Sequence, residues 1–275
     1  MNIVRLPEAR EWMIWAGIVI VASIVFMAVF APFIAPYDPT EMTNDILKPP
    51  SLKHIMGTDN LGRDIFSRVV YGSRVVLEVV FSATLFSMAI GVPLGLISGY
   101  FGGKLDRVLS MVMDSIYAFP SLILAIAIAA MLGPSVFNAI IAIAVVYVPT
   151  YYRMTRGQTL SLKSALFVEA AKTIGAGDFR IIRKHILPNV LPTILVVFTL
   201  CVADAILTEA GLSFLGFIVS APTPDWGFDL STGRPYLPAG YWWLITFPGL
   251  MVMLLALGFA LIGEGLSERY LRREI

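Results

Sequence analysis

Six long apolar stretches, almost free of charged residues, constrain this chain more than any other feature. They cover residues 12–35, 75–100, 116–132, 136–152, 190–218 and 241–262. About twenty apolar residues in a helix cross the hydrocarbon core of a bilayer, and lipid offers the backbone of an open strand no hydrogen-bonding partner. Charged residues make up 14% of the chain, against about a quarter in soluble domains. The sequence therefore predicts an all-α, polytopic membrane protein with six transmembrane helices.

The distribution of Lys and Arg predicts how these helices are oriented. With the N-terminus inside the cell, 14 of the 20 basic residues fall in cytosolic segments and 6 fall outside, as the positive-inside rule requires. We therefore expect a multi-pass protein of the cytoplasmic (inner) membrane with both termini in the cytosol. The first stretch is too long for a signal peptide and lacks a small-residue cleavage site, so we expect a retained helix.

The expected organisation has two parts and one prominent loop. Residues 1–74 form an N-terminal transmembrane helix with an external segment, and residues 75–275 form a five-helix core. A polar segment at about residues 160–190 separates the fourth and fifth apolar stretches. A membrane protein rarely keeps so long an amphipathic loop unless something outside the bilayer binds it, so we interpret this segment as a docking element.

The docking segment has the pattern of two short helices separated by a break. Apolar residues in its first part recur at helical spacing and form one stripe: Leu166, Phe167, Ala170, Ala171 and Ile174. Gly175 supplies the positive φ at which helices commonly end, and Asp178 is expected to cap the second helix. A helix lying on the bilayer surface is the alternative, although such a helix does not require the break at Gly175.

Several kinds of chemistry are excluded by residues that the chain lacks or keeps apart. It has no Gly-x-x-x-x-Gly-Lys-Ser/Thr loop for nucleotide phosphates. His54 and His185 fall on opposite sides of the membrane in the predicted topology, so they cannot form a zinc pair. Cys201 is the single cysteine, which rules out an intrachain disulfide, and a net charge of +1 does not recruit nucleic acid. We therefore expect a non-catalytic chain without a metal site.

The docking segment resembles the EAA loop of permease subunits in type I, binding-protein-dependent ATP-binding cassette (ABC) importers. The resemblance rests on Glu169-Ala170-Ala171, Gly175 and Ile186-Leu187-Pro188. His185 stands where the general pattern has Ile, and this variant is similar to the dipeptide and oligopeptide (and nickel) permease branch. Further stretches agree with that branch: residues 54–68, 118–120, 211–216, 222–227 and 263–266. The resemblance implies a MetI-like permease fold.

The resemblance also implies a subunit that forms half of a translocation path for short peptides and does not hydrolyse ATP itself. The implied partners are a second homologous permease, two ABC ATPase subunits and an external substrate-binding protein. ATP and Mg²⁺ would be bound by the ATPases, and this chain would carry no cofactor. Nickel chelates, glutathione or oligosaccharides are alternative cargos, and an ion-coupled secondary carrier is a distant alternative function. The implied ATPase-coupling residues are Leu166, Phe167, Glu169, Ala170, Ala171, Thr173, Ile174, Gly175 and Asp178.

Polar residues in the fifth apolar stretch are candidates for the translocation path: Asp204, Thr208 and Glu209. An ionised carboxylate near the bilayer centre costs about 2.5–3.5 kcal/mol, so it should face protein or water. Asp204 and Glu209 lie roughly 140° apart around a helix, which means that at most one carboxylate lines the path. We favour Asp204, which lies near the middle of the bilayer; a purely structural carboxylate is the alternative.

The external segments contain two further patterns. Asp59 with Arg63 and Asp64 with Arg68 have the i,i+4 spacing of ion pairs on a helix, from which we expect a structural cap between the first two spans. Direct contact with the binding protein is the alternative. Close to the sixth stretch, a Pro-rich segment is predicted to contact an external partner through Pro224, Asp225 and Trp226.

A small-residue stripe marks the second apolar stretch, where Gly91, Gly95 and Gly99 recur every fourth residue. Glycines at this spacing allow a second helix to approach closely in a membrane. We therefore expect helix packing at this stripe and not a binding site.

Overall fold

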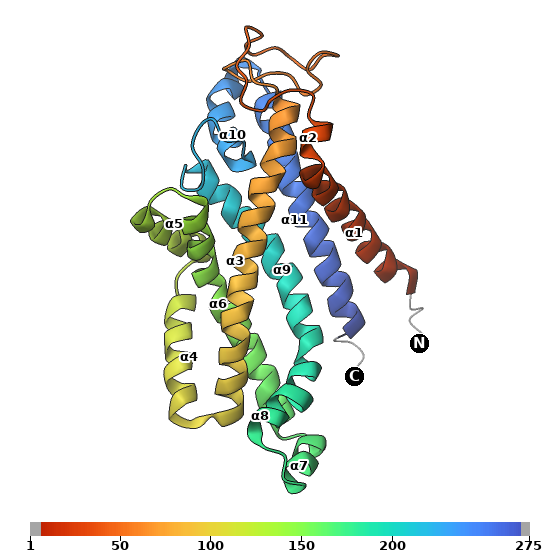
Figure 1. The fold of residues 1–275 in the computed structure, drawn as a ribbon, viewed down its shortest axis with the longest axis vertical. Helices are drawn as coiled ribbons and strands as arrows, with labels where there is room; N and C mark the ends of the chain where they lie inside the picture. The colour runs from red at the N-terminus through yellow and green to blue at the C-terminus, as the bar shows by residue number, and fades with distance from the viewer. Residues whose placement is uncertain (1–6, 271–275) are drawn as a thin grey trace.

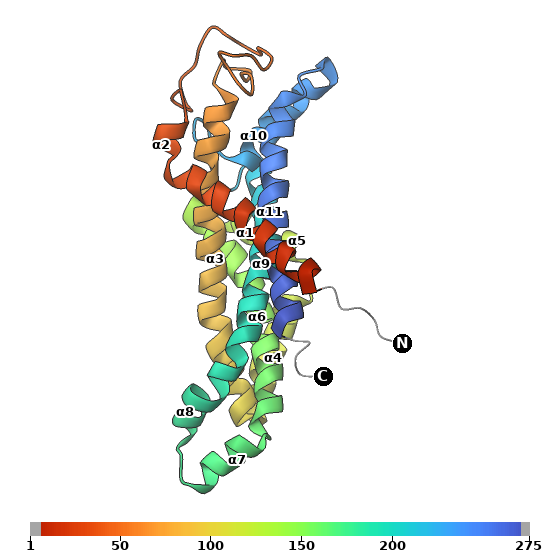
Figure 2. The same cartoon turned by 90° about the vertical axis from the view of Figure 1, so that its right-hand side faces the viewer.

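The computed structural model describes residues 7–270, which form a bundle of helices. Within this range, five helices are long and apolar enough to cross a membrane. They are α1 (Pro7–Val29), α3 (Ile65–Phe101), α6 (Val136–Lys163), α9 (Leu187–Phe214) and α11 (Trp243–Tyr270). All except α1 run close to the long axis, and α1 crosses α11 at a tilt (Figure 1, Figure 2). The prediction of an all-α, polytopic membrane protein is confirmed.

The third predicted span is a broken helix. One transmembrane helix over residues 116–132 was expected, but α4 (Gly103–Tyr117) and α5 (Ser121–Leu132) meet at 90°. Pro120 lacks a backbone N–H, and its ring disfavours the helical conformation at Phe119. At 12 residues, α5 is about 18 Å long and too short to cross a bilayer alone. The third of the six predicted spans is therefore the bent α4–α5 pair.

The fifth predicted span is longer than expected, because it continues into the docking loop. The short helix α8 (Asp178–Ile181) runs through a π turn, η1 (Ile182–Ile186), directly into α9. Pro188 has no N–H to bond to the carbonyl of Lys184, and its ring crowds that carbonyl. A wider π turn at this point relieves the conflict without ending the helix. The result is one helical segment of 37 residues, about 55 Å long.

The centre of the bundle is the contact between α3 and α6, and it depends on glycine. A Cβ added at Gly91, Gly95 or Gly99 would lie 2.6, 2.7 or 2.8 Å from a backbone carbonyl oxygen of α6. Carbon atoms do not approach oxygen so closely, so each glycine admits the facing helix where no larger residue fits. The predicted packing stripe is confirmed.

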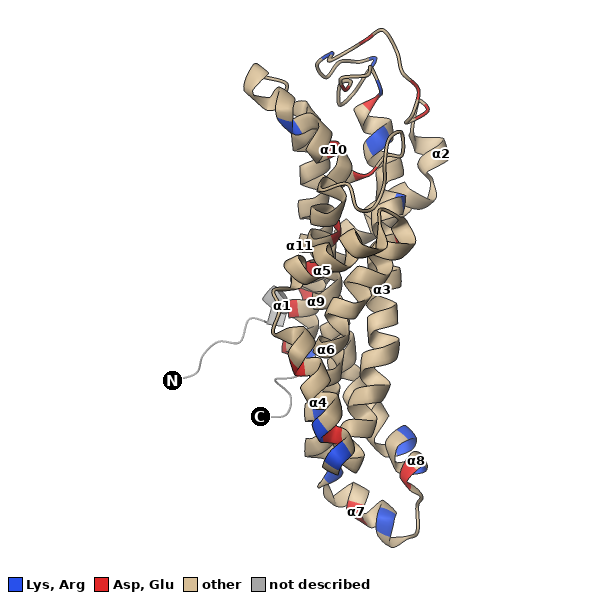
Figure 3. Ribbon diagram, turned by 90° about the vertical axis from the view of Figure 1, so that its left-hand side faces the viewer, with Lys and Arg blue, Asp and Glu red and all other residues tan. Residues whose placement is uncertain are grey.

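The two ends of the bundle differ in shape and charge. At one end, α7 (Leu166–Thr173) and α8 project beyond the other helices, and Lys and Arg gather around them (Figure 3). At the opposite end lie α2 (Ala31–Ile34), the segment 35–64, α10 (Trp226–Gly233) and the 3₁₀ helix η2 (Arg234–Ala239). We refer to these as the α7 end and the α10 end.

The segment before α3 is ordered by buried polar side chains, in a partly different arrangement from the predicted one. Arg63 Nε donates to Asp59 at 2.6 Å, as the spacing predicts, although the two residues flank a turn and are not part of a helix. The predicted pair of Asp64 with Arg68 is wrong. The carboxylate of Asp64 caps α3 by accepting from the backbone N–H of Ser67 at 2.8 Å and contacts His54 Nδ1 at 2.9 Å. Helix capping takes the acceptor that an i,i+4 pair would need.

Candidate functional site

The projecting helix α7 buries one side against its own chain and leaves the other free. Val168 and Ala171 are 0% and 5% exposed and pack into the main core. Leu166 and Ile174 are 82% and 85% exposed, although both are large and apolar. The predicted stripe therefore divides: Ala171 is unavailable for docking, and Val168, which the sequence pattern did not single out, anchors the helix. The other residues predicted to couple to an ATPase are exposed: Leu166, Phe167, Glu169, Ala170, Thr173, Ile174, Gly175 and Asp178.

The break after α7 occurs where it was predicted. Gly175 has φ +83°, and the N–H of Ala176 donates to the carbonyl of Ala171 at 3.0 Å, so the last turn closes as at many helix ends. The predicted cap by Asp178 is wrong, since α8 starts at this residue and its side chain makes no cap hydrogen bond. Asp178 instead accepts from the hydroxyl of Tyr100 at 2.6 Å. This bond ties the docking loop to the end of α3.

A polar cavity lies beside the break between α4 and α5. Its volume is about 240 Å³, and its walls come from both sides of the break, from α6 and from α9. Asp204 lines it and accepts from the hydroxyl of Tyr147 at 2.7 Å, while the same hydroxyl lies 3.1 Å from Thr208 Oγ1. We call this space the upper cavity; it is lined by Ile116, Tyr117, Phe119, Ser121, Leu124, Val146, Tyr147, Thr150 and Asp204.

The two acidic residues of α9 have different surroundings, as their rotation around the helix predicts. Asp204 is exposed at the upper cavity, whereas Glu209 is fully buried and Thr208 nearly so. Glu209 lies beside Asp225, which accepts from the hydroxyl of Ser213 and from the N–H of Phe228 at the start of α10. Glu209 thus belongs to the joint between α9 and α10, away from the upper cavity.

The three residues predicted to contact an external partner are interior residues of this chain. Pro224, Asp225 and Trp226 are all buried. The indole N–H of Trp226 donates to the carbonyl of Val69 at 2.9 Å. These side chains therefore hold α10 against α3 and α9, and in this structure they do not face an external partner. A buried indole needs a polar partner for its N–H, which explains the fixed place of Trp226.

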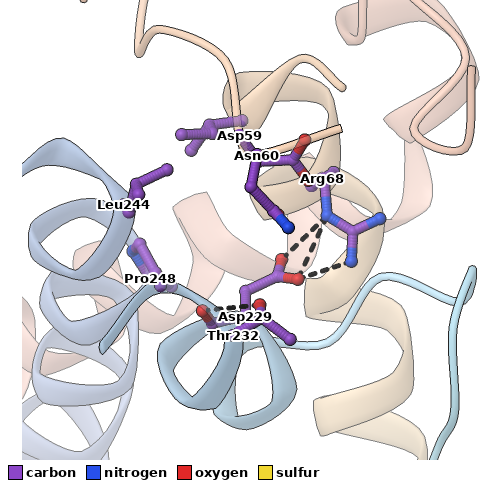
Figure 4. A pocket seen from close by; sticks show the side chains of 9 residues that line it. Asp59, Asn60, Arg68, Asp229, Thr232, Leu244 and Pro248 are labelled. Carbon is purple, nitrogen blue, oxygen red and sulfur yellow. Dashed lines mark hydrogen bonds and ion pairs between the residues drawn. The ribbon is translucent and has the colours of Figure 1, made fainter. Parts of the chain in front are cut away.

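A buried arginine organises the α10 end (Figure 4). Arg68 Nε donates to both carboxylate oxygens of Asp229, at 3.1 and 3.2 Å, and Nη1 donates to the carbonyls of Pro39 and Pro222 at 3.0 and 3.1 Å. Burial raises the pKa of Asp229 to about 6, although the guanidinium opposes that shift. The sequence pattern missed this cluster because its partners are up to 161 residues apart. It joins three chain segments, which is a structural role.

A helical bundle of membrane length with a polar cavity at mid-depth and a projecting, partly apolar helix at one end is the architecture of a membrane transport permease. Residues 91–272 match the family model for the inner membrane component of binding-protein-dependent transport systems, and residues 9–50 match the N-terminal transmembrane domain of oligopeptide transport permease C. The chain belongs to this family of ABC importer permeases. The predicted family resemblance is thereby confirmed.

Relatives and solved structures agree with the family. The chain is 46% identical to the dipeptide transport system permease protein DppC of Alkalihalophilus pseudofirmus, over 92% of this chain and 83% of that protein. It is 40% identical to DppC of Haemophilus influenzae (92% and 88% covered) and to the glutathione transport system permease protein GsiD of Escherichia coli (94% and 86% covered). A chain of the inward-facing MetNI methionine ABC transporter superposes with a TM-score of 0.60 at 23% identity, covering 77% of this chain and 98% of that chain. This likeness confirms the MetI-like fold.

Proposed function

We propose that this permease subunit forms one half of a path for short peptides and is driven by cytosolic ATPases that bind α7. The observation that carries the coupling part is the helix at the α7 end, which is fixed on its inner side and exposes large apolar side chains on its outer side. The peptide cargo is supported by relatives named as dipeptide permeases at 40–46% identity. A relative named as a glutathione permease also carries a peptide-like molecule. Nickel chelates and oligosaccharides have no comparable support.

The proposed docking of α7 is of a kind that many protein grooves use to bind a helix. An amphipathic helix binds by placing apolar anchors in a hydrophobic groove, with charged groups at the rim. Leu166 and Ile174 would be the anchors, and Phe179, which is exposed just after the break, would extend the apolar surface. Glu169 is exposed on the same helix and would pair with a basic group of the ATPase. The second permease, two ATPases with ATP and Mg²⁺, and an external binding protein complete the proposed complex.

The upper cavity is the proposed part of the path within this chain. Asp204 is exposed there at mid-depth of the bundle, where a peptide's α-ammonium needs a negative partner. Tyr147 holds the carboxylate in place with one hydrogen bond and leaves the second oxygen free of any bond within residues 11–269. Thr208 would support Tyr147 from behind, and Glu209 would have no direct role in the path.

Asp204→Asn is expected to lower the rate of dipeptide uptake about tenfold, because it removes a charge-assisted hydrogen bond of about 1.5 kcal/mol or more. Asn keeps the shape and accepts from Tyr147, so assembly and ATPase activity should be unchanged. Uptake of radiolabelled dialanine by the reconstituted complex measures the effect. Asp38→Asn, which makes the same change at an exposed residue of the α10 end, is the control. Normal uptake in Asp204→Asn would make this carboxylate a structural residue.

The proposed function is tested by purification and reconstitution. A tagged form of the chain, extracted from its native membrane in mild detergent, should bring down a second permease and ABC ATPases. In liposomes, this complex with its binding protein should import radiolabelled dialanine when ATP is supplied. Dialanine uptake by this chain alone, driven by a proton gradient, would favour the secondary carrier instead.

The proposed orientation places α7 and both termini in the cytosol. It is supported by the Lys and Arg residues that gather at the α7 end (Figure 3). With Cys201 replaced by Ser, a single cysteine at Lys172→Cys should react with a membrane-impermeant thiol reagent in opened cells only. A single cysteine at Thr223→Cys should react in intact cells, since both residues are exposed at opposite ends. The reverse labelling pattern would overturn this orientation.

A further inference from the structure

A second hollow lies next to the upper cavity, further along α6 toward the α7 end. Its volume is about 420 Å³, and we call it the lower cavity; it is lined by Ser110, Asp114, Tyr152, Arg153 and Arg156. Tyr117 connects the two spaces, because it lines the upper cavity and its ring lies 4.6 Å from the guanidinium of Arg153. The two cavities therefore follow one another along the same helices, α4 and α6.

The two arginines of the lower cavity differ in their partners. Arg156 donates two hydrogen bonds to the carboxylate of Asp106, from Nε at 2.5 Å and from Nη2 at 2.7 Å. Asp106 also accepts from the hydroxyl of Ser98 on α3. This group joins α3, α4 and α6, and a bidentate contact of this kind occupies the guanidinium. Arg156 is therefore a structural residue.

The guanidinium of Arg153 keeps its donors free. Its side chain is 52% exposed, and within residues 11–269 its one ionic contact is from Nε to Asp114 at 3.9 Å. That distance is too long for a hydrogen bond, and an exposed pair so far apart stabilises a fold very little. The ring of Tyr117 supports one face of the guanidinium and leaves its N–H edges open to the cavity. A planar fork of free donors is the group that binds a carboxylate best.

Asp204 and Arg153 lie in successive cavities, in an order that suits the two ends of a short peptide. Tyr147, which holds the carboxylate of Asp204, and Arg153 are six residues apart on α6, which is about 9 Å along the helix axis and about 120° around it. Thr150 lines the upper cavity, and Arg153 follows it by three residues on the same side of the helix. An extended dipeptide is about 7 Å long, and a hydrogen bond at each end extends its reach to roughly 12 Å, which is enough to enter both cavities.

We propose that Arg153 binds the terminal carboxylate of a peptide in the translocation path while Asp204 binds its α-ammonium. The proposal rests on the proposed peptide cargo. It makes the path a binding site for a zwitterion, with Asp204 in the upper cavity and Arg153 in the lower cavity. The competing explanation is that Arg153 is one of many basic residues near the membrane boundary and that Asp114 is its structural partner.

The test uses the complete transporter in liposomes, with its ATPases and binding protein, and radiolabelled dialanine as the probe. Arg153→Gln should lower uptake roughly tenfold or more, because the carboxylate loses a charge-assisted contact. Arg153→Lys should fall between this variant and the wild type, since Lys keeps the charge without the fork. ATP hydrolysis stimulated by the binding protein should persist in both. Lys104→Gln, which removes a positive charge from an exposed position at the same end, should transport normally.

A charge exchange separates cargo binding from a structural ion pair. The double variant Asp114→Arg with Arg153→Asp restores an ion pair but not a guanidinium above Tyr117, so uptake should stay low. Normal uptake in Arg153→Gln, or recovery in the double variant, would overturn the assignment of Arg153 and leave the peptide cargo standing. A wild-type complex that hydrolyses ATP and imports no dialanine would overturn the peptide cargo itself, and the Arg153 proposal with it.

Discussion

Ala170→Asp is expected to abolish dipeptide uptake in a complex that still inserts into the membrane. Ala170 is exposed on the free side of α7, so a carboxylate there does not disturb the chain's own core. When the helix enters the ATPase groove, this carboxylate would be buried without a partner, at a cost of about 3–5 kcal/mol. A cost of that size weakens docking more than about a hundredfold. Uptake and substrate-stimulated ATP hydrolysis in liposomes measure the loss of coupling.

Three variants show whether the effect belongs to docking. Ser161→Asp adds the same charge at an exposed residue of α6 and should transport normally. Gly175→Val should also uncouple, because a β-branched residue resists φ +83° even though a Cβ there meets no other atom. Ala171→Asp should fail differently, with less folded protein, since Ala171 lies in the core. Normal coupling in both Ala170→Asp and Gly175→Val would remove the docking role of α7.

Gly95→Val should strongly destabilise the bundle. The added Cβ would lie 2.7 Å from the carbonyl oxygen of Tyr152 and 2.8 Å from the Cβ of Thr155, and the two further methyl groups need still more room. Overpacking of this kind costs about 1–3 kcal/mol where the neighbours can move, and a rigid helix backbone can move less. We expect a large loss of folded protein in the membrane and a lower unfolding temperature of what remains.

The matched control for this change is another helical glycine. Gly157 lies on α6 with nothing within 4 Å of an added Cβ. Gly157→Ala should be neutral or should stabilise the helix by up to about 1 kcal/mol. Detergent thermal unfolding followed by size-exclusion chromatography compares the two variants. Equal stability of Gly95→Val and the wild type would contradict the close approach of α3 and α6.

The apolar runs predict the architecture because the bilayer allows few alternatives, but they do not predict breaks or distant partners. Residues 116–132 have the composition of a straight span, and the effect of Pro120 on direction depends on packing that the run does not encode. The spacing of Asp64 and Arg68 predicts an ion pair that helix capping prevents. The true partner of Arg68, Asp229, is 161 residues away, and no local pattern connects them.

The same limit applies to the candidate sites. Helical spacing predicts an apolar stripe on α7, and the break at Gly175 confirms where that helix ends. Spacing alone does not indicate which side the chain's own core covers, so Ala171 was placed on the wrong side. The rotation between Asp204 and Glu209 follows from helix geometry and predicts their different surroundings. The burial of Trp226 depends on the carbonyl of Val69, which only the folded chain brings near.

The unbroken helical segment from Asp178 to Phe214 has a consequence for how movement reaches the cargo. No flexible linker separates the docking loop from Asp204, and the hydrogen bond between Tyr100 and Asp178 connects the loop to α3 as well. A tilt of about ten degrees around the middle of a 55 Å rod shifts its docking end by about 5 Å and Asp204, which lies about 12 Å from the middle, by about 2 Å. The π turn at Ile182–Ile186 and Pro192 inside α9 interrupt the regular hydrogen bonding along that rod. The stiffness of this helical segment therefore determines how much of a movement of the ATPases is transmitted to the upper cavity.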